Sequence, residues 1–555
     1  MKRIFVLLIL FLGCCGNIFS QTNNWLWAKS ASSIAGSGNE GWAISTDNAG
    51  NVFIVGAFNS PTITFGSTIL TNAGHANLFI AKYDYNGNVL WAKSFGGALS
   101  DEAISVCTDA EGNAFITGEF ESPTITFGST TFTNTGGTDL FIVKFDGSGN
   151  VLWANNGTGA DEDQGLSVSA DAGGNVFVSG YFIGPTVTFA STTLVNAGGL
   201  SAHFDIFLCK YDANGNLLWA KSAGGTSEDE GASVSADAEG NVFLTGIFDS
   251  PSITFGSTIL TNPGFFIAKY DSNGNVLWAK STIGAGNNNG TYVCADRNGN
   301  AFVTGLFTKP TITFSPITLT NANNNNSAED LFIAKYDANG NVLWAKSAGG
   351  MNDEIGFCLS TDTSSNVYLT GKFTSSAITF GSITLPQPIG SVDPMFIVKY
   401  DPLGNVLCAA ALSSGGDDKN GVSADRFGNA YVGGDFFTNP FIVGSDTLIP
   451  TGTEDVFIAK YNCNLDAGVN EIAIQDPISI SPNPFSSSTT IQFTTTPKNA
   501  ELNIYNLYGQ EIRSIKNISS NKTDLNRGDL LSGIYFVRLV EGEKLIGVGK
   551  IIITD

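Results

Sequence analysis

Charged and catalytic side chains are scarce in this sequence. Asp, Glu, Lys and Arg together make up only 14% of 555 residues, and there are two histidines, His75 and His203. Neither histidine has a partner at metal-ligand spacing, and no Gly-x-Ser-x-Gly, His-Glu-x-x-His or phosphate-binding glycine loop occurs. We therefore assign no catalytic residue, interpret both histidines as exposed loop residues, and favour a non-enzymatic protein over an enzyme.

Basic residues are also few. Lys and Arg number 27 against 50 Asp and Glu, which gives a formal net charge of -23. A surface this acidic repels phosphate backbones, so the composition argues against nucleic acid as a partner. Cations, basic proteins and neutral glycans remain as classes of ligand.

Long apolar runs are absent outside the N-terminus. Lys2 and Arg3 precede the apolar run Ile4–Leu12, and small residues follow, which is the pattern of a secretory signal peptide over residues 1–20. Cys14 lies in a weak lipoprotein signal, so a lipid-anchored alternative stays open. No other segment has the roughly 18 consecutive apolar residues of a transmembrane helix, so none is predicted in the mature chain.

Cysteines are few and irregularly spaced. Those after the predicted signal peptide are Cys107, Cys209, Cys294, Cys358, Cys408 and Cys463. They fall within expected strands and share no spacing, so neither a disulfide framework nor a paired metal site is predicted. We expect buried free thiols.

Glycine and phenylalanine are abundant, at 65 and 40 residues. Long helices normally carry more lysine and glutamate than this chain has, so the composition predicts an all-β protein with many turns.

A stretch of two predicted strands joined by a tight turn recurs along the chain. Its fullest copy is Leu331–Ser347. Related copies occupy Phe79–Trp91, Phe141–Trp153, Phe207–Trp219, Phe266–Trp278 and Phe396–Cys408. The residue that ends each copy recurs roughly every 60 to 66 positions, which exceeds the length of a minimal four-stranded propeller repeat.

Each repeat is expected to hold four strands and an additional hairpin. The second strand, as in Asn241–Gly246, is apolar on both faces, as a sheet stacked between two neighbours requires. Asp-x-x-Gly-Asn segments such as Asp237–Asn241 are interpreted as type I turns with a glycine bulge. Half a calcium loop is the alternative, but the downstream carboxylates of a full loop are missing. The additional hairpin, as in Pro61–Leu70, is followed by variable loops.

The last copy, Phe457–Tyr461, lacks its second strand, and Trp25–Ser30 near the other end of the chain supplies the missing sequence. This split predicts an all-β, seven-bladed β-propeller over residues 21–463, closed by its N- and C-terminal strands, because closure removes the open edges of a linear array. The repeats resemble the bacterial β-propeller repeat family. That resemblance implies the fold but no single chemistry.

After a predicted linker at residues 464–476, residues 477–555 read as a small β-sandwich. Ser481–Phe485, Ile504–Glu511 and Leu530–Arg538 follow one another in this order. Together they resemble the type A C-terminal sorting domain of type IX secretion in Bacteroidota; an ordinary accessory sandwich domain is the alternative. The candidate sorting-motif residues are Pro482, Asn483, Pro484, Gly509, Gly533 and Tyr535.

The resemblance of the tail implies a route and a destination. It implies Sec export to the periplasm, passage through the outer membrane by the type IX secretion machinery, and removal of the tail. The mature protein would then be secreted or held at the outer-membrane surface, with lipopolysaccharide as the implied anchor.

The crossing from each fourth strand to the next first strand is acidic in most repeats. These candidate rim residues are Glu40, Asp101, Glu102, Asp161, Glu162, Asp163, Glu228, Asp229, Glu230, Asp353, Glu354, Asp417 and Asp418. The fifth repeat has Asn287–Asn289 instead. We expect them to ring one mouth of the central channel, where they would bind cations such as Ca²⁺ or a cationic ligand. A solvated rim that keeps an exported protein soluble is the alternative.

Three functional hypotheses follow. The first is a cell-surface or secreted module for binding or adhesion, with an extracellular protein or glycan as partner. The second is a secreted glycan-active enzyme that uses two carboxylates at the mouth. The third is a structural component of a surface layer. The near-identity of the repeats favours the first over the second, because catalysis usually breaks such symmetry.

Overall fold

The computed structural model describes residues 24–33, 38–199, 203–284, 292–323, 328–388, 391, 393–413, 420–437, 439–463, 478–493, 496–506, 511–542 and 544–555. Within these ranges the chain forms strands and no helix, so the all-β prediction is confirmed and no described segment is a candidate membrane-spanning helix. The chain separates into two compact units, Met1–Leu465 and Asp466–Asp555. The predicted signal peptide and linker lie outside the described residues.

Seven antiparallel sheets, here called the first to seventh repeat sheets, share one order of four strands in the N-terminal unit. Their first strands are β3 (Asn39–Thr46), β9 (Asp101–Thr108), β15 (Asp163–Ala170), β21 (Asp229–Ala236), β27 (Tyr292–Ala295), β33 (Glu354–Thr361) and β39 (Gly421–Ala424). Each first strand contacts the first strand of the next sheet, and β39 contacts β3. The first strands therefore lie together at the centre of the unit.

The second and third strands are the buried middle of each sheet. The second strands are β4 (Val52–Phe58), β10 (Ala114–Phe120), β16 (Val176–Phe182), β22 (Val242–Phe248), β28 (Ala301–Phe307), β34 (Val367–Phe373) and β40 (Asn429–Phe436). The third strands are β7 (Asn77–Tyr83), β13 (Asp139–Phe145), β19 (Asp205–Tyr211), β25 (Gly264–Tyr270), β31 (Asp330–Tyr336), β37 (Met395–Tyr400) and β43 (Asp455–Asn462). In β4 and β7 every residue is buried, as predicted for strands covered on both faces.

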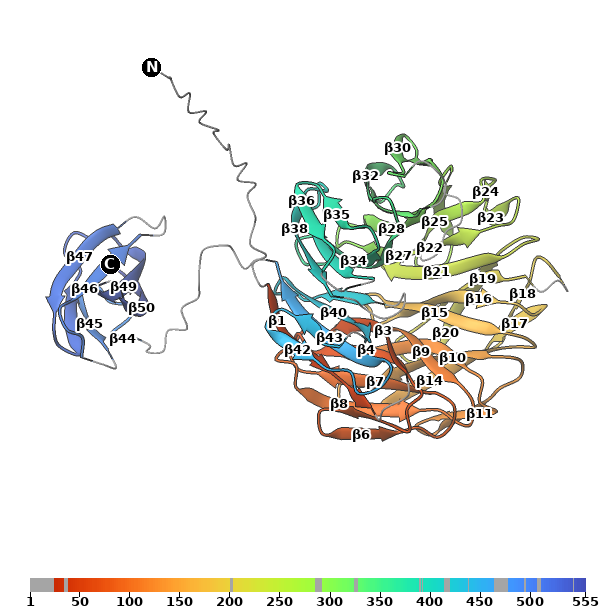
Figure 1. Ribbon diagram of the computed structural model, residues 1–555, viewed down its shortest axis with the longest axis horizontal. Helices are drawn as coiled ribbons and strands as arrows, with labels where there is room; N and C mark the ends of the chain where they lie inside the picture. The colour runs from red at the N-terminus through yellow and green to blue at the C-terminus, as the bar shows by residue number, and fades with distance from the viewer. Residues whose placement is uncertain are drawn as a thin grey trace, which may run out of the picture. The chain divides into compact units, whose positions relative to one another are not determined.

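The fourth strands are more exposed. They are β8 (Val89–Phe95), β14 (Val151–Gly159), β20 (Leu217–Ala223), β26 (Val276–Ser281), β32 (Val342–Ala348), β38 (Val406–Leu412) and β1 (Trp25–Ser30). β1 pairs antiparallel with β43, with Ala28 opposite Ala459 (Figure 1). The predicted pairing of Trp25–Ser30 with the last third strand is therefore confirmed.

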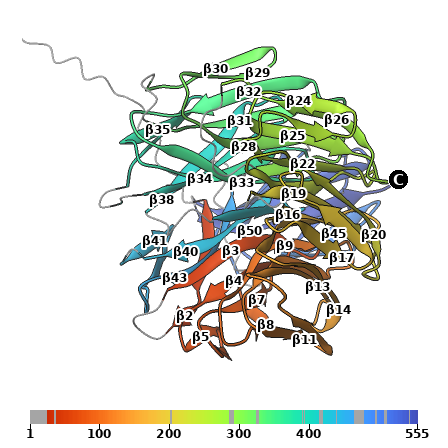
Figure 2. The ribbon, with the colours of Figure 1, turned by 90° about the vertical axis from the view of Figure 1, so that its right-hand side faces the viewer.

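The additional length of each repeat forms a short hairpin, as predicted. The hairpins are β5 (Thr62–Phe65) with β6 (Thr68–Thr71), β11 (Thr124–Phe127) with β12 (Thr130–Thr133), β17 (Thr186–Phe189) with β18 (Thr192–Val195), β23 (Ile253–Phe255) with β24 (Thr258–Leu260), β29 (Thr311–Phe314) with β30 (Ile317–Thr320), β35 (Ala377–Phe380) with β36 (Ile383–Pro386), and β41 (Phe441–Val443) with β42 (Asp446–Leu448). The two-residue strand β2 (Ser32–Ser33) joins β5, and β17 joins β14. The hairpins lie at the outer margin of the unit (Figures 1 and 2).

Hydrophobic cores lie between consecutive repeat sheets rather than within one sheet. One cluster joins Phe53 and Ile80 of the first sheet to Val106 and Phe141 of the second. Another joins Tyr431 and Ile458 of the seventh sheet to Ile44 of the first. Because each cluster needs side chains from two sheets, the sheets stabilise one another as neighbours.

In six of the seven repeat sheets, a buried lysine of the third strand forms an ion pair with the turn between the first two strands. Lys269 lies 3.0 Å from Asp237, which also accepts hydrogen bonds from both nitrogens of Asn241. The Lys269 ammonium also donates to the carbonyl of Gly299 in the next sheet and lies over the ring of Phe243. The same arrangement recurs at Lys82–Asp47, Lys144–Asp109, Lys210–Asp171, Lys335–Asp296 and Lys399–Asp362. The Asp-x-x-Gly-Asn segments are thus turns, as predicted, whose carboxylates are already occupied by internal hydrogen bonds.

A tryptophan of the fourth strand reaches the next sheet in six of the seven repeat sheets. The indole Nε1 of Trp344 donates to the carbonyl of Pro402, which lies in the turn between the third and fourth strands of the sixth sheet. Equivalent bonds join Trp27 to Tyr85, Trp91 to Gly147, Trp153 to Ala213, Trp219 to Ser272 and Trp278 to Ala338. The tryptophans are therefore packing residues that join neighbouring sheets.

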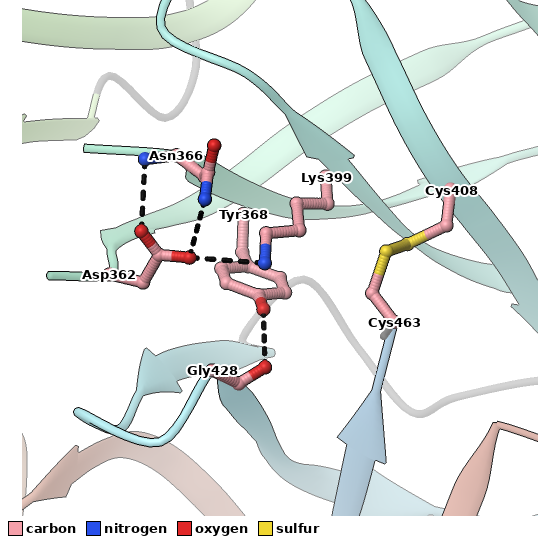
Figure 3. The surroundings of a disulfide bond; sticks show 7 residues. All are labelled: Asp362, Asn366, Tyr368, Lys399, Cys408, Gly428 and Cys463. Carbon is pink, nitrogen blue, oxygen red and sulfur yellow. Dashed lines mark hydrogen bonds and ion pairs between the residues drawn. A yellow bond between two sulfur atoms is a disulfide. The ribbon is translucent and has the colours of Figure 1, made fainter. Parts of the chain in front are cut away.

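The sixth sheet differs, and here the prediction of free thiols throughout is wrong. Cys408 takes the place of the tryptophan and forms a disulfide with Cys463, which follows β43 (Figure 3). Cys463 occupies the turn position that Tyr85 and Pro402 occupy elsewhere. The fourth strand of the seventh sheet is β1, so no turn joins it to β43. At this junction the Cys408–Cys463 disulfide replaces the indole hydrogen bond that links the other sheets. Cys107, Cys209, Cys294 and Cys358 are free, as predicted.

The C-terminal unit consists of two antiparallel sheets around one core. One sheet has the order β44 (Ser479–Ser481), β45 (Ser488–Gln492), β48 (Lys522–Asn526), and the other β47 (Glu511–Ile518), β46 (Ala500–Tyr505), β49 (Gly533–Glu541), β50 (Lys544–Ile553). Ile491 of the first sheet packs with Leu502, Val537 and Ile551 of the second. The expected small sandwich is therefore present.

Candidate functional site

The structure separates the candidate rim residues into two groups. Asp101, Asp163, Asp229 and Glu354 are the first residues of their strands and are fully buried, at 0% exposure. Asp101 accepts a 2.7 Å hydrogen bond from the Ser122 hydroxyl, and Asp229 accepts an equivalent one from Ser250. These four side chains point into the junctions between sheets, so they do not form part of an exposed rim.

The second group remains accessible to a ligand. Glu40, Glu102, Glu162, Glu230 and Asp353 are half-buried, whereas Asp161 and Glu228 are exposed. Asp353 accepts a hydrogen bond from the Glu329 amide, which ties it to the preceding loop. Asp417 and Asp418 lie outside the described residues, as do Asn287–Asn289.

One position of the second strands varies from sheet to sheet within an otherwise constant Gly-x-Phe segment. The variable residues are Ala57, Glu119, Tyr181, Ile247, Leu306, Lys372 and Asp435. In the second and third sheets, this position lies opposite the second residue of the first strand: Glu119 lies opposite Glu102, and Tyr181 lies opposite Gln164. The sequence analysis missed these residues. Comparing the repeats position by position would have found them, because their neighbours hardly change.

An acidic cluster forms where the second and third repeat sheets meet. We define it by Glu102, Glu119, Glu162, Gln164 and Tyr181. The Tyr181 hydroxyl donates to Glu162 Oε1 at 2.7 Å, and Gln164 Nε2 donates to the same oxygen at 3.1 Å. Glu119 Oε2 is buried and has no hydrogen-bond partner among the residues that the structure describes. The cluster thus holds the Glu162 carboxylate in a fixed position and leaves one oxygen of Glu119 without a donor among the described residues.

Burial and repulsion act together on this cluster. Burial, together with the nearby carboxylates of Glu102 and Glu162, raises the pKa of Glu119 to about 8. Burial also raises the pKa of Tyr181, whose hydroxyl therefore stays a donor. Near neutral pH the cluster presents a protonated carboxyl at Glu119 beside Glu162, which accepts two hydrogen bonds. Such a set suits a cation or a ligand rich in hydroxyl groups.

The raised pKa of Glu119 predicts that this residue's contribution to folding stability depends on pH. The folded state binds this proton more tightly than the unfolded state, whose ordinary pKa is 4.5, so the stabilisation is complete below that pH and is lost as the pH rises through about 8. Glu119→Gln imitates the protonated carboxyl. We expect its melting temperature to match the wild type near pH 5 and to exceed it near pH 9, measured by thermal denaturation in matched buffers.

The control for this comparison is Glu111→Gln, which removes the same charge at an exposed turn on the other end of β10. Its melting temperature should differ from the wild type by the same small amount at both pH values. A pH-independent effect of Glu119→Gln would contradict the raised pKa.

The histidines take no part in this cluster. His75 is exposed and bonds to the Ser100 hydroxyl, as expected for a loop residue, but His203 is half-buried, so the prediction that both are exposed is wrong for His203. Within the described ranges, no group of three or more His, Cys, Asp or Glu side chains converges in a way that would hold a metal ion.

The candidate sorting-motif residues hold the end of the chain against the start of its unit. Asn483 binds one edge of β50: its side chain donates to the Lys550 carbonyl at 2.7 Å and accepts from the Ile552 amide at 2.7 Å. The carbonyl of Pro482 accepts from Thr489, and the Tyr535 hydroxyl donates to the Leu531 carbonyl. Pro484 follows Asn483, Gly533 begins β49, and Gly509 lies outside the described residues. These bonds hold the last strand of the unit against its first residues.

Comparison with known families identifies this tail. Residues 479–554 match the family described as "Secretion system C-terminal sorting domain". The prediction of a sorting domain at the C-terminus is confirmed, and the match indicates type IX secretion.

The repeat unit has more distant relatives. An uncharacterized WD repeat-containing protein of Acanthamoeba polyphaga mimivirus is 24% identical over 541 residues, which cover 79% of this chain and 38% of the relative. The regulatory protein FlaEY of Caulobacter vibrioides is 26% identical over 163 residues, or 29% of this chain and 17% of the relative. The chain thus spans well under half the length of these curated relatives.

Among solved structures, PorZ of Porphyromonas gingivalis, described as a bacterial surface component of the type-IX secretion system, is similar at 10% identity and a TM-score of 0.22, with 96% of this chain and 86% of that chain covered. WD repeats form β-propellers, so the mimivirus relative agrees with the repeat sheets described above. The chain is a propeller-like β-repeat protein that carries a secretion system C-terminal sorting domain, and this domain marks it as a secreted or cell-surface protein.

Proposed function

We propose that this protein is an exported binding module, built on a closed seven-bladed β-propeller and displayed at or released from the cell surface. The contacts of β39 with β3 and the pairing of β1 with β43 support the closed ring, because they join the two ends of the repeat array. Residues 1–20 serve as the signal peptide in this proposal, and the tail is removed after export.

The acidic cluster is the proposed binding site. The observation that carries this assignment is the variable position of the Gly-x-Phe segments, where Glu119 and Tyr181 break the symmetry of the array. A structural repeat has no packing reason to place a half-buried glutamate beside two others, and doing so costs stability. Selection for a ligand explains the arrangement. The chemistry of the cluster favours a cationic group or the hydroxyls of a glycan.

One observation favours a second candidate function, a glycan-active enzyme. Glu119 holds its proton near neutral pH, whereas Glu162 is placed as an acceptor by Tyr181 and Gln164. A protonated and an ionised carboxyl side by side are the acid and base that glycoside hydrolysis requires. Binding remains our primary proposal.

The test is a glycan and extracellular-protein array probed with the full chain after the signal peptide, followed by affinity measurements on every ligand found. We expect Glu119→Gln and Tyr181→Phe each to weaken binding about tenfold, the value of one or two hydrogen bonds to a ligand. Glu111→Gln is the matched control and should bind as the wild type does. Unchanged affinity in both cluster variants would place the site elsewhere, and release of reducing sugar that Glu119→Gln abolishes would favour the enzyme.

A further inference from the structure

Two polar side chains meet at five of the junctions between consecutive repeat sheets. One is the first residue of a third strand, and the other is the first residue of the next sheet's first strand. The backbone brings them together: the amide of Asp163 donates to the carbonyl of Thr138 at 2.9 Å, directly before Asp139. The amides of Asp229 and Glu354 donate in the same way to Phe204 and Glu329.

The junctions are of two kinds. At two of them an amide faces a carboxylate: Asn39 lies beside Asp455, and Asn77 beside Asp101. There the amide has a proton to donate, and Asn39 Nδ2 lies 3.3 Å from Asp455 Oδ1. At three other junctions two carboxyl groups meet, and neither can donate when both are ionised. These pairs are Asp139 with Asp163, Asp205 with Asp229, and Asp330 with Glu354.

All six carboxyl groups of these pairs are at most 1% exposed. Within the described part of the chain, neither oxygen of Asp163 has a hydrogen-bond partner, and Asp205 Oδ1, Asp330 Oδ1 and Glu354 Oε2 also lack one. Asp163 stands out because Gly184 takes the position of Ser122 and Ser250, the hydroxyl donors of Asp101 and Asp229.

A glycine also lies against each pair. A Cβ atom on Gly159 would come within 2.3 Å of Asp163 Oδ2, and one on Gly224 within 2.0 Å of Asp205 Oδ1. Any other residue would clash with the carboxylate, so these positions require glycine; Gly96 lies in the same way against Asn77 at an amide junction.

Two buried carboxylates side by side need a positive charge between them. The charges that act on Asp163 are the carboxylates of Asp139, Asp161 and Glu162, which together with burial raise its pKa to about 8. Asp139 already accepts hydrogen bonds from the amide and hydroxyl of Thr135, so one shared proton would satisfy only one oxygen of Asp163 and leave its other oxygen unpaired. A divalent cation can bind oxygens of both groups at once, and oxygen ligands are those that Ca²⁺ prefers.

We propose that the Asp139–Asp163 junction binds Ca²⁺ as a bridge between the second and third repeat sheets, and that the Asp205–Asp229 and Asp330–Glu354 junctions are further sites of the same design. This inference is independent of the acidic cluster and of any ligand there. The carboxylates at the strand starts would then bind a cation between the sheets rather than at the mouth of the ring.

The experiment uses the full chain after the signal peptide, first stripped with a chelator and then titrated with CaCl₂ by calorimetry and by thermal denaturation. We expect about one to three Ca²⁺ per chain, one for each double-carboxyl junction, and a melting temperature at least about 2 °C higher with Ca²⁺ than without. Asp163→Asn should bind one Ca²⁺ fewer, and Glu119→Gln should keep the full number, which separates this site from the acidic cluster.

The amide junctions supply matched controls. Asp455→Asn changes a carboxylate beside Asn39 and should leave the Ca²⁺ count unchanged, whereas Asn77→Asp creates a fourth double-carboxyl junction beside Asp101 and should add one site. The proposal fails if the stripped wild type binds no Ca²⁺ at millimolar concentration. It also fails if Asp163→Asn raises the melting temperature equally with and without Ca²⁺, because the pair would then share a proton.

Discussion

Replacing Asp237 with alanine is expected to lower the free energy of unfolding by about 3–5 kcal/mol. The substitution leaves the ammonium group of Lys269 buried without its counter-charge, since both side chains of this 3.0 Å pair are at most 4% exposed. It also removes the acceptor that closes the turn before β22. The loss can be measured as a shift of the guanidinium unfolding midpoint.

Asp271 offers a matched control in the same sheet. It caps the turn between β25 and β26 with the same hydrogen bonds to Asn275, but it is only half-buried and forms no ion pair with a buried lysine among the described residues. Asp271→Ala should therefore lower stability by only about 1 kcal/mol. The double variant Asp237→Asn with Lys269→Met should recover most of the loss, because replacing both partners of a buried pair is far less costly than removing one. Equal effects of Asp237→Ala and Asp271→Ala would show that the turn, and not the buried lysine, determines stability.

The second large effect is expected at the disulfide. Removing it, either by reduction or by Cys408→Ala with Cys463→Ala, should lower the free energy of unfolding by about 2–4 kcal/mol, because the bond closes a loop whose ends are 55 residues apart. It also ties the sixth sheet to the seventh, the sheet that the N-terminal strand must complete. A hydrogen bond crosses the same junction near the disulfide, because the Tyr368 hydroxyl donates to the Gly428 carbonyl (Figure 3).

Thermal denaturation with and without a reductant measures this contribution. The wild type should lose several degrees in melting temperature on reduction, and the double-alanine variant should melt near the reduced wild type under both conditions. The variant thereby controls for effects of the reductant on the rest of the protein. A reductant effect of the same size in the variant would contradict the assignment to this bond. A disulfide also agrees with export, since such bonds persist in oxidising compartments.

The repeat frame could be predicted from the sequence because it rests on local patterns. Alternating or continuous apolar runs define the strands, Asp-x-x-Gly-Asn defines the turns, and each copy reinforces the assignment of the others. The pairing of Trp25–Ser30 with β43 followed from counting strands. The sorting tail followed from three motifs in a set order, and the matched family confirms it.

The candidate site was harder, because its residues are decided by which face of a strand they occupy. Asp101 and Glu102 are neighbours in the sequence, yet Asp101 is fully buried at a junction and Glu102 is half-buried opposite Glu119. A shift of one residue in the register would exchange them. Glu119 and Tyr181 escaped attention because they lie in second strands, where an apolar residue is the rule.

What the sequence by itself determined is the strand content, the order of the repeats, the exchange of a strand between the two ends and the type of the tail. Only the tertiary structure decided that Cys408 and Cys463 are bonded, that four acidic residues of the crossings are buried between sheets, and that one acidic cluster forms between the second and third sheets. The physical reason is distance along the chain. Strands and turns arise from contacts within a few residues, whereas these features join side chains that only the packing of one sheet on the next brings together.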